Sequence, residues 1–106
     1  MLPQWIITLG ARTPVRSDAG KVGRFETQDY RMIEKIVREQ SGFEGCTIVR
    51  AHGYFQGKGE DTVQIIILEA NYERIRACAQ LLRTTFRQRS VMVVCAGAGE
   101  FLAGDK

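Results

Sequence analysis

The sequence predicts an α+β fold, a ferredoxin-like sandwich in which a four-stranded antiparallel sheet carries two helices on one face. Three observations predict it. Strand-like and helix-like segments follow one another in the order strand, helix, strand, strand, helix, strand, which is the βαββαβ order of that fold. Residues 62–70 are almost continuously apolar, as expected for a central strand. The 106 residues suffice for one core, so we expect a single domain over 1–106.

The first half of the chain is expected to form a strand, a long loop and a helix. Residues 5–9 (WIITL) are aromatic and β-branched and predict the first strand. Residues 11–26 are rich in turn formers and basic side chains, and they form a loop longer than most connections. Thr27 is expected to cap a helix that ends at Ser41–Gly42.

The second half is expected to form a hairpin, a helix and a last strand. Residues 46–55 predict the second strand, and the reversal at 56–61 leads into the central strand. Asn71 is expected to cap a helix whose apolar stripe ends near Phe86. Residues 90–96 predict the last strand, and residues 97–106 a flexible tail. In this fold the sheet face without helices is open and often serves as an oligomer or ligand interface.

The charged residues favour anionic partners and are mostly arginine. The formal net charge is +3, which by itself is too small to indicate nucleic acid. Of the 15 basic residues, 11 are arginine, the residue best suited to bidentate carboxylate or phosphate contacts. A compositional bias of the genome is the alternative explanation.

The cysteines and the hydropathy pattern indicate a cytoplasmic location. Cys46, Cys78 and Cys95 form no CxxC pair and lie within apolar patterns, which is typical of buried free thiols in a reducing compartment. No apolar run approaches the about 20 residues of a membrane helix. The start of the chain lacks the basic region of a signal peptide. We therefore expect no membrane contact.

Two glycine-rich segments resemble nucleotide-binding motifs but depart from them. Residues 53–59 (GYFQGKG) have one residue too few between the glycines, and a strand follows where a phosphate loop needs a helix. Residues 97–102 (GAGEFL) have Leu102 where a dinucleotide fingerprint needs its third glycine. A single histidine and scattered cysteines give no metal-ligand spacing. We expect no cofactor and no metal.

Nucleic-acid binding through an aromatic sheet face is also not expected, which leaves only weak contacts to phosphate groups as an alternative. A ribonucleoprotein-type sheet has the same strand order but displays aromatic side chains on its central strands. Residues 62–70 contain no aromatic residue, and the basic-glycine-aromatic motif of that class is absent.

Two groups of residues are candidates for a ligand site. The first is the set of basic residues in the long loop, which either bind an anion or only make an ordinary solvent-exposed connection. The second lies on the second strand, where alternation places three polar or aromatic side chains on one face. If that face is the open one, the two groups can form one anion site. The candidate ligand-binding residues are Arg12, Arg16, Lys21, Arg24, Arg50, His52 and Tyr54.

His52 has two interpretations. As the only histidine it can act as a general base, oriented by a carboxylate such as Glu60, Asp61 or Glu69. It can equally be an ordinary half-exposed strand residue. We therefore assign no catalytic residue.

A longer pattern resembles a bacterial domain family of unknown function. Residues 42–55 (GFEGCTIVRAHGYF), the acid Glu60 and the helix end FRQRSV at 86–91 follow the order of that family. The resemblance implies a ferredoxin-like shape and no activity. Independently of it, Gln88 is expected to satisfy carbonyl groups where helix meets strand.

These observations favour a cytoplasmic binding or regulatory module that is homo-oligomeric and takes an anionic ligand or a protein partner. The alternative is a cofactor-independent small enzyme of the dimeric α+β-barrel type that uses His52 and Tyr54. A purely structural interaction protein is the third possibility. A closed apolar pocket with His52 or Tyr54 pointing into it would favour the enzyme.

Overall fold

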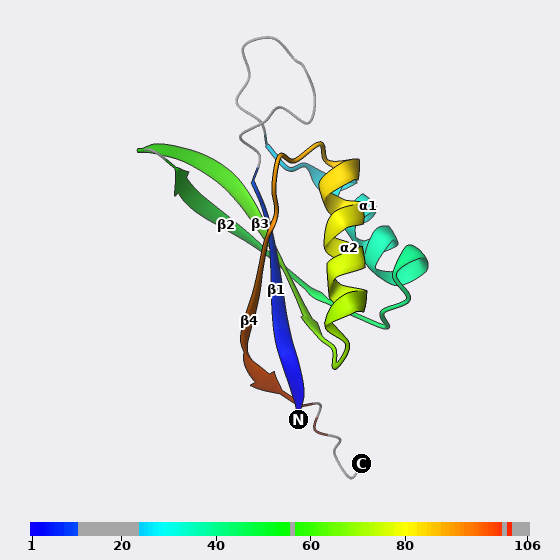
Figure 1. Cartoon of the computed structure of the whole chain (residues 1–106). Coiled ribbons are helices and arrows are strands. Elements are labelled where there is room, and N and C mark those ends of the chain that lie inside the picture. Colours follow the sequence, from blue (N-terminus) through cyan, green and yellow to red (C-terminus); the bar gives the residue numbers. More distant parts are fainter. Residues whose placement is uncertain (11–23, 56, 101, 103–106) are drawn as a thin grey trace.

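The computed structural model describes residues 1–10, 24–55, 57–100 and 102. It confirms the predicted fold class, because a four-stranded antiparallel sheet carries two helices on one face (Figure 1). The elements, in chain order, are β1 (Leu2–Gly10), α1 (Thr27–Lys35), η1 (Ile36–Gln40), β2 (Thr47–Phe55), β3 (Lys58–Leu68), α2 (Tyr72–Thr85) and β4 (Met92–Gly99).

The strands lie in the order β2-β3-β1-β4, so β1 and β3 are central and β2 and β4 are the edges. This confirms the central place predicted for residues 62–70. Ile7 pairs with Ile65, and Leu9 pairs with Val63, across the two central strands. These four side chains are fully buried beneath the helices.

The hairpin between β2 and β3 is tighter than the sequence suggested. Phe55 pairs with Lys58, so β3 starts four residues before the expected start at Thr62. Gly57 has φ of +77°, a conformation that glycine adopts without a steric cost and that tight hairpins need. Glu60 and Asp61, expected in a loop, are therefore strand residues.

The first helix differs from the prediction in its N-cap residue and in the geometry of its last turn. Its N-cap is Glu26 and not Thr27, because the backbone N–H of Glu26 donates to Asp29 Oδ2 at 2.7 Å. The α-helix gives way to a π-helical turn over Ile36–Gln40. The segment ends at Ser41 and Gly42 as expected, with φ of +75° at Gly42.

The second helix follows the prediction closely. The side chain of Asn71 caps it by accepting the backbone N–H of Glu73 at 2.9 Å. Gln88 satisfies the helix end, where its Nε2 donates to the carbonyl of Phe86 at 3.4 Å. Its Oε1 accepts the N–H of Gly10 at 3.2 Å and so ties this corner to β1. The strand β4 then continues to Gly99, three residues into the expected tail.

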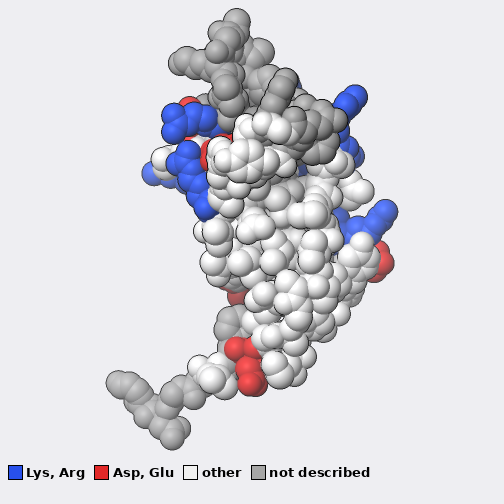
Figure 2. Space-filling view, turned by 90° about the vertical axis from the view of Figure 1, so that its left-hand side faces the viewer, with Lys and Arg blue, Asp and Glu red and all other residues white. Residues whose placement is uncertain are grey.

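The open face of the sheet carries few charges. By register, Ile6 lies between Ile66 and Val94 on this face, and Met92 lies beside Thr8. Figure 2 shows this side of the molecule as a largely uncharged surface with basic and acidic groups at its rim. Among the described residues, no helix is long and apolar enough to cross a membrane.

Candidate functional site

Arg50, His52 and Tyr54 share one face of β2, as the alternation predicted, but that face is not the open one. Arg50 pairs with Val63, whose side chain points into the core beneath the helices. Because a strand alternates strictly, His52 and Tyr54 point to the same side. The hairpin extends past the helices (Figure 1), which leaves all three side chains exposed.

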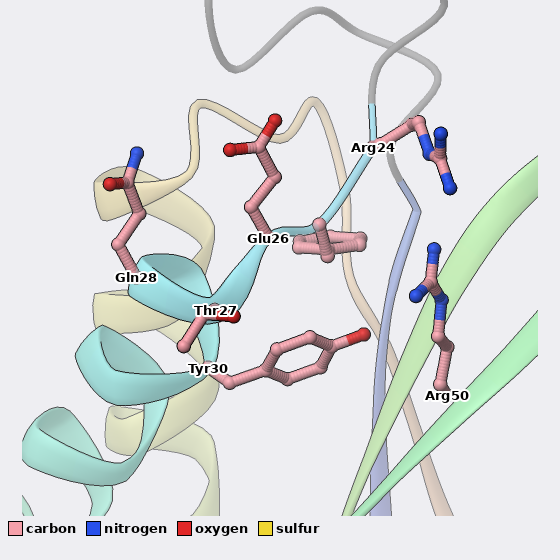
Figure 3. Close-up of a pocket in the computed structure, with 7 residues that line it drawn as sticks. Arg24, Glu26, Thr27, Gln28, Tyr30 and Arg50 are labelled. Carbon is pink, nitrogen blue, oxygen red and sulfur yellow. The ribbon is translucent and has the colours of Figure 1, made fainter.

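A pocket with a volume of about 440 Å³ lies between the start of α1 and β2. In Figure 3, the side chains of Arg24 and Arg50 approach one another at one end of this pocket, and the hydroxyl of Tyr30 points toward the strands beside them. The side chains of Glu26 and Gln28 point the other way. The lining residues are Arg24, Phe25, Glu26, Thr27, Gln28, Tyr30 and Arg50.

Asp61 does not line this pocket but binds two residues that do, Phe25 and Arg50. Its Oδ1 accepts a hydrogen bond from Arg50 Nε at 3.2 Å, and its Oδ2 accepts one from Arg50 Nη2 at 3.4 Å. The same Oδ2 accepts the backbone N–H of Phe25 at 2.9 Å. The hydrogen bond to Asp61, with the charge of that carboxylate, raises the pKa of Arg50 above its ordinary value. Asp61 thus connects the segment before α1 to the sheet and orients Arg50; it does not orient His52, for which it had been a candidate.

Tyr30 is a candidate site residue that the sequence pattern did not reveal. It occupies the first position of the helical stripe, where an aromatic ring indicates only core packing. In the structure its ring packs against the core, and its hydroxyl oxygen is buried with no hydrogen-bond partner among residues 1–10, 24–55, 57–100 and 102. An orphaned polar atom of this kind costs about 1–3 kcal/mol.

The charges around the pocket favour an anion. Two guanidinium groups, of Arg24 and Arg50, line one end of it, and Asp61 offsets one of them. The carboxylate of Glu26 also belongs to the lining but points away from the two arginines (Figure 3). Thr27 begins α1, and the N-terminal end of a helix carries partial positive charge, part of which the capping box of Glu26 and Asp29 already offsets. The arrangement can hold a carboxylate or phosphate by charge-assisted hydrogen bonds.

The other predicted residues lie outside this pocket. The rings of His52 and Tyr54 pack edge to face with centroids 5.0 Å apart, and neither lines the cavity. His52 lies over Gly59, where an added Cβ would come within 2.6 Å of its Nε2. Arg12, Arg16 and Lys21 lie outside the described residues. Of the seven candidates, the structure brings together Arg24 and Arg50.

Comparisons with known proteins identify a fold and no family. No protein-family model matches the chain, and a search of curated proteins gives no match either. A solved phage SAM lyase in complex with S-methyl-5'-thioadenosine aligns with a TM-score of 0.67, covering 92% of this chain and 83% of that one at 21% identity. Phage SAM lyase in its apo state aligns with a TM-score of 0.64, covering 86% and 76% at 23% identity. This likeness agrees with a ferredoxin-like α+β fold.

Proposed function

We propose that this chain is a binding module for a small anionic ligand, held between Arg24, Arg50 and Tyr30. The observation that carries the proposal is the hydroxyl of Tyr30, which lies buried beside two guanidinium groups and has no hydrogen-bond partner in the described part of the chain. A ligand oxygen can accept from this hydroxyl and so remove its desolvation cost. The pocket volume of about 440 Å³ suits a small carboxylate or phosphate compound.

Further contributors to this site remain predictions. The basic residues Arg12, Arg16 and Lys21 precede the pocket in sequence and add to its positive charge if they lie nearby. His52 and Tyr54 lie farther along the same face of β2 and can contact a larger ligand. The uncharged open face of the sheet supports assembly with further copies of this chain.

The proposal is tested by titrating inorganic phosphate and then citrate while recording ¹⁵N NMR signals of the backbone and of the arginine Nε groups. We expect shifts at Arg24, Arg50 and the first turn of α1. R24Q and R50Q should each weaken binding about tenfold, because each removes a charge-assisted hydrogen bond. R31Q is the matched control, since Arg31 is an exposed arginine farther along α1. Equal binding by all three variants, or the absence of shifts at the pocket, would contradict the proposal.

An enzyme is the second candidate function, and the likeness to phage SAM lyases favours testing one reaction first. The phage SAM lyase structure contains S-methyl-5'-thioadenosine, so this is the compound whose formation we would measure. Incubation of this chain with SAM, followed by chromatography, would show whether that compound forms. H52A and Y54F would then test whether these side chains contribute. Unchanged SAM at high protein concentration would remove this reaction from consideration and leave the anion site untouched.

A further inference from the structure

The segment from Arg74 to the end of β4 carries only positively charged side chains, and Glu73 precedes it in the first turn of α2. Between Arg74 and Gly99 the sequence contains five arginines and neither aspartate nor glutamate. Arg74 is engaged, because it donates to Glu69 Oε2 at 2.9 Å and lies over the ring of Phe43. The other four arginines are Arg76, Arg83, Arg87 and Arg89.

Three of these arginines line a groove between α2 and the edge strand β4, with a volume of about 520 Å³. Arg83 is held in place by the side chain of Gln80, whose Oε1 it contacts at 2.8 Å. Arg76 and Arg89 pair with no acidic group in the described part of the chain. The groove also has an apolar side formed by Tyr72, Val91 and Val93.

The groove runs beside an edge of the sheet that the described chain leaves unpaired. β4 pairs with β1 along one side, and no described strand pairs with its other side. The outward N–H and C=O groups of such a strand are available to a further strand. This edge is the one opposite β2, and therefore opposite the proposed anion pocket.

We propose that this groove binds an extended acidic segment of a partner protein, which adds a strand to β4 and places alternate carboxylates on the arginines of α2. Arg76 and Arg83 are seven residues apart on the helix, a rise of about 10 Å. Alternate side chains of a strand are about 7 Å apart, so five residues present three carboxylates over about 13 Å. Main-chain hydrogen bonds supply affinity, and the arginines supply specificity.

A second copy of this chain is a poorer occupant of the groove. Its own edge strands offer no carboxylate, since neither β2 nor β4 contains an acidic residue. β2 instead carries Arg50, which would repel the arginines of α2. Charge complementarity therefore selects an acidic partner.

The test uses a blocked synthetic peptide with glutamate at alternate positions and valine or threonine between them. We expect ¹⁵N shifts and slowed amide exchange over Met92–Gly99, with shifts at the Nε groups of Arg76, Arg83 and Arg89. A peptide with lysine in place of glutamate should not bind. Two further peptides, N-methylated at odd or at even positions, separate strand addition from charge attraction alone. One of the two must lose binding if the peptide pairs with β4.

The protein variants complete the test. R76Q and R89Q should each weaken peptide binding about two- to fivefold, as expected for exposed charge pairs, and the double variant about tenfold. R31Q removes the same charge from α1 and should leave binding unchanged. The proposal is overturned if no shift appears at β4 with millimolar peptide, or if both N-methylated peptides bind as well as the parent. Two further results would also overturn it. The first is that pyrophosphate alone gives the same arginine shifts while the peptide gives no amide protection, which would indicate a small-anion site. The second is that the β4 signals change only with protein concentration, which would indicate self-association.

Discussion

Replacement of Tyr30 by phenylalanine should stabilise the protein and weaken its ligand binding at the same time. The hydroxyl of Tyr30 is buried and has no hydrogen-bond partner among the described residues. Tyr30→Phe removes this oxygen and keeps the ring, which packs against the core. The cost of an unpaired buried polar atom is about 1–3 kcal/mol. We expect a gain near the lower end, about 1 kcal/mol, because the hydroxyl lies next to a pocket.

The free energy of unfolding is measured by urea titration, with the circular dichroism of the helices as the signal. An unchanged slope with a higher midpoint would show that the native state itself is more stable. For a domain of this size, about 1 kcal/mol corresponds to an increase in Tm of about 4–8 °C. Tyr72→Phe is the matched control, because the Tyr72 side chain is 43% exposed, and its stability should change by less than about 0.5 kcal/mol.

The same variant is then titrated with phosphate and citrate. Loss of one hydrogen bond to a charged ligand should weaken binding about tenfold. Opposite signs of the two effects are typical of a residue kept for binding at the expense of stability. The reasoning is refuted if Tyr30→Phe destabilises the fold, since the hydroxyl would then have a favourable partner. Unchanged anion affinity would refute the role of Tyr30 in the site.

Three further predictions concern the fold. Ile65→Ala should lower the free energy of unfolding by about 2–5 kcal/mol in a urea titration, because Ile65 is fully buried in the central strand; a loss below about 1 kcal/mol would contradict its place in the core. Asn71→Ala should cost about 1 kcal/mol by the same assay, since it removes the cap on the N–H of Glu73, while Asn71→Ser should restore most of the loss. Burial raises the pKa of the Cys78 thiol above its ordinary value, so its alkylation in the folded protein should begin only at higher pH than in the urea-unfolded chain, as followed by mass spectrometry. The neutral Cys78 thiol stabilises the fold fully below the ordinary thiol pKa, and this contribution should disappear as the pH rises through the raised value; the same pH profile of Cys78 alkylation in the folded and the unfolded chain would contradict this account.

Periodicity was sufficient to predict the elements, because burial acts directly on the residue pattern. The apolar run that contains Ile65 predicted a central strand, and Asn71 marked a helix start correctly. The register of the β2–β3 hairpin was harder to predict, since it depends on the turn. Gly57 allows a tight turn, but the glycine-rich segment has several glycines and does not show which of them makes the turn. That register determined which face of β2 carries Arg50.

The candidate site could be predicted only in part, for a related reason. Arg50 was identified from alternation along its strand, and Arg24 from the charge of the long loop. Asp61 was expected in a loop, so its contact with Arg50 across the hairpin was not foreseen. The burial of the Tyr30 hydroxyl without a partner among the described residues results from three-dimensional packing, and the spacing of apolar residues along a helix does not reveal it.

The strand order also has a consequence for the time at which the protein folds. β1 is a central strand, yet one of its two partners is β4, the last strand in the sequence. Ile7 of β1 can therefore pair with Val93 only after β4 has been synthesised. A nascent chain synthesised only as far as the end of α2 contains three strands and both helices, but one edge of β1 still has no partner strand. Such long-range pairing slows folding and exposes an apolar edge during synthesis. We therefore expect the sheet to close in one late step, after Gly99 has left the ribosome.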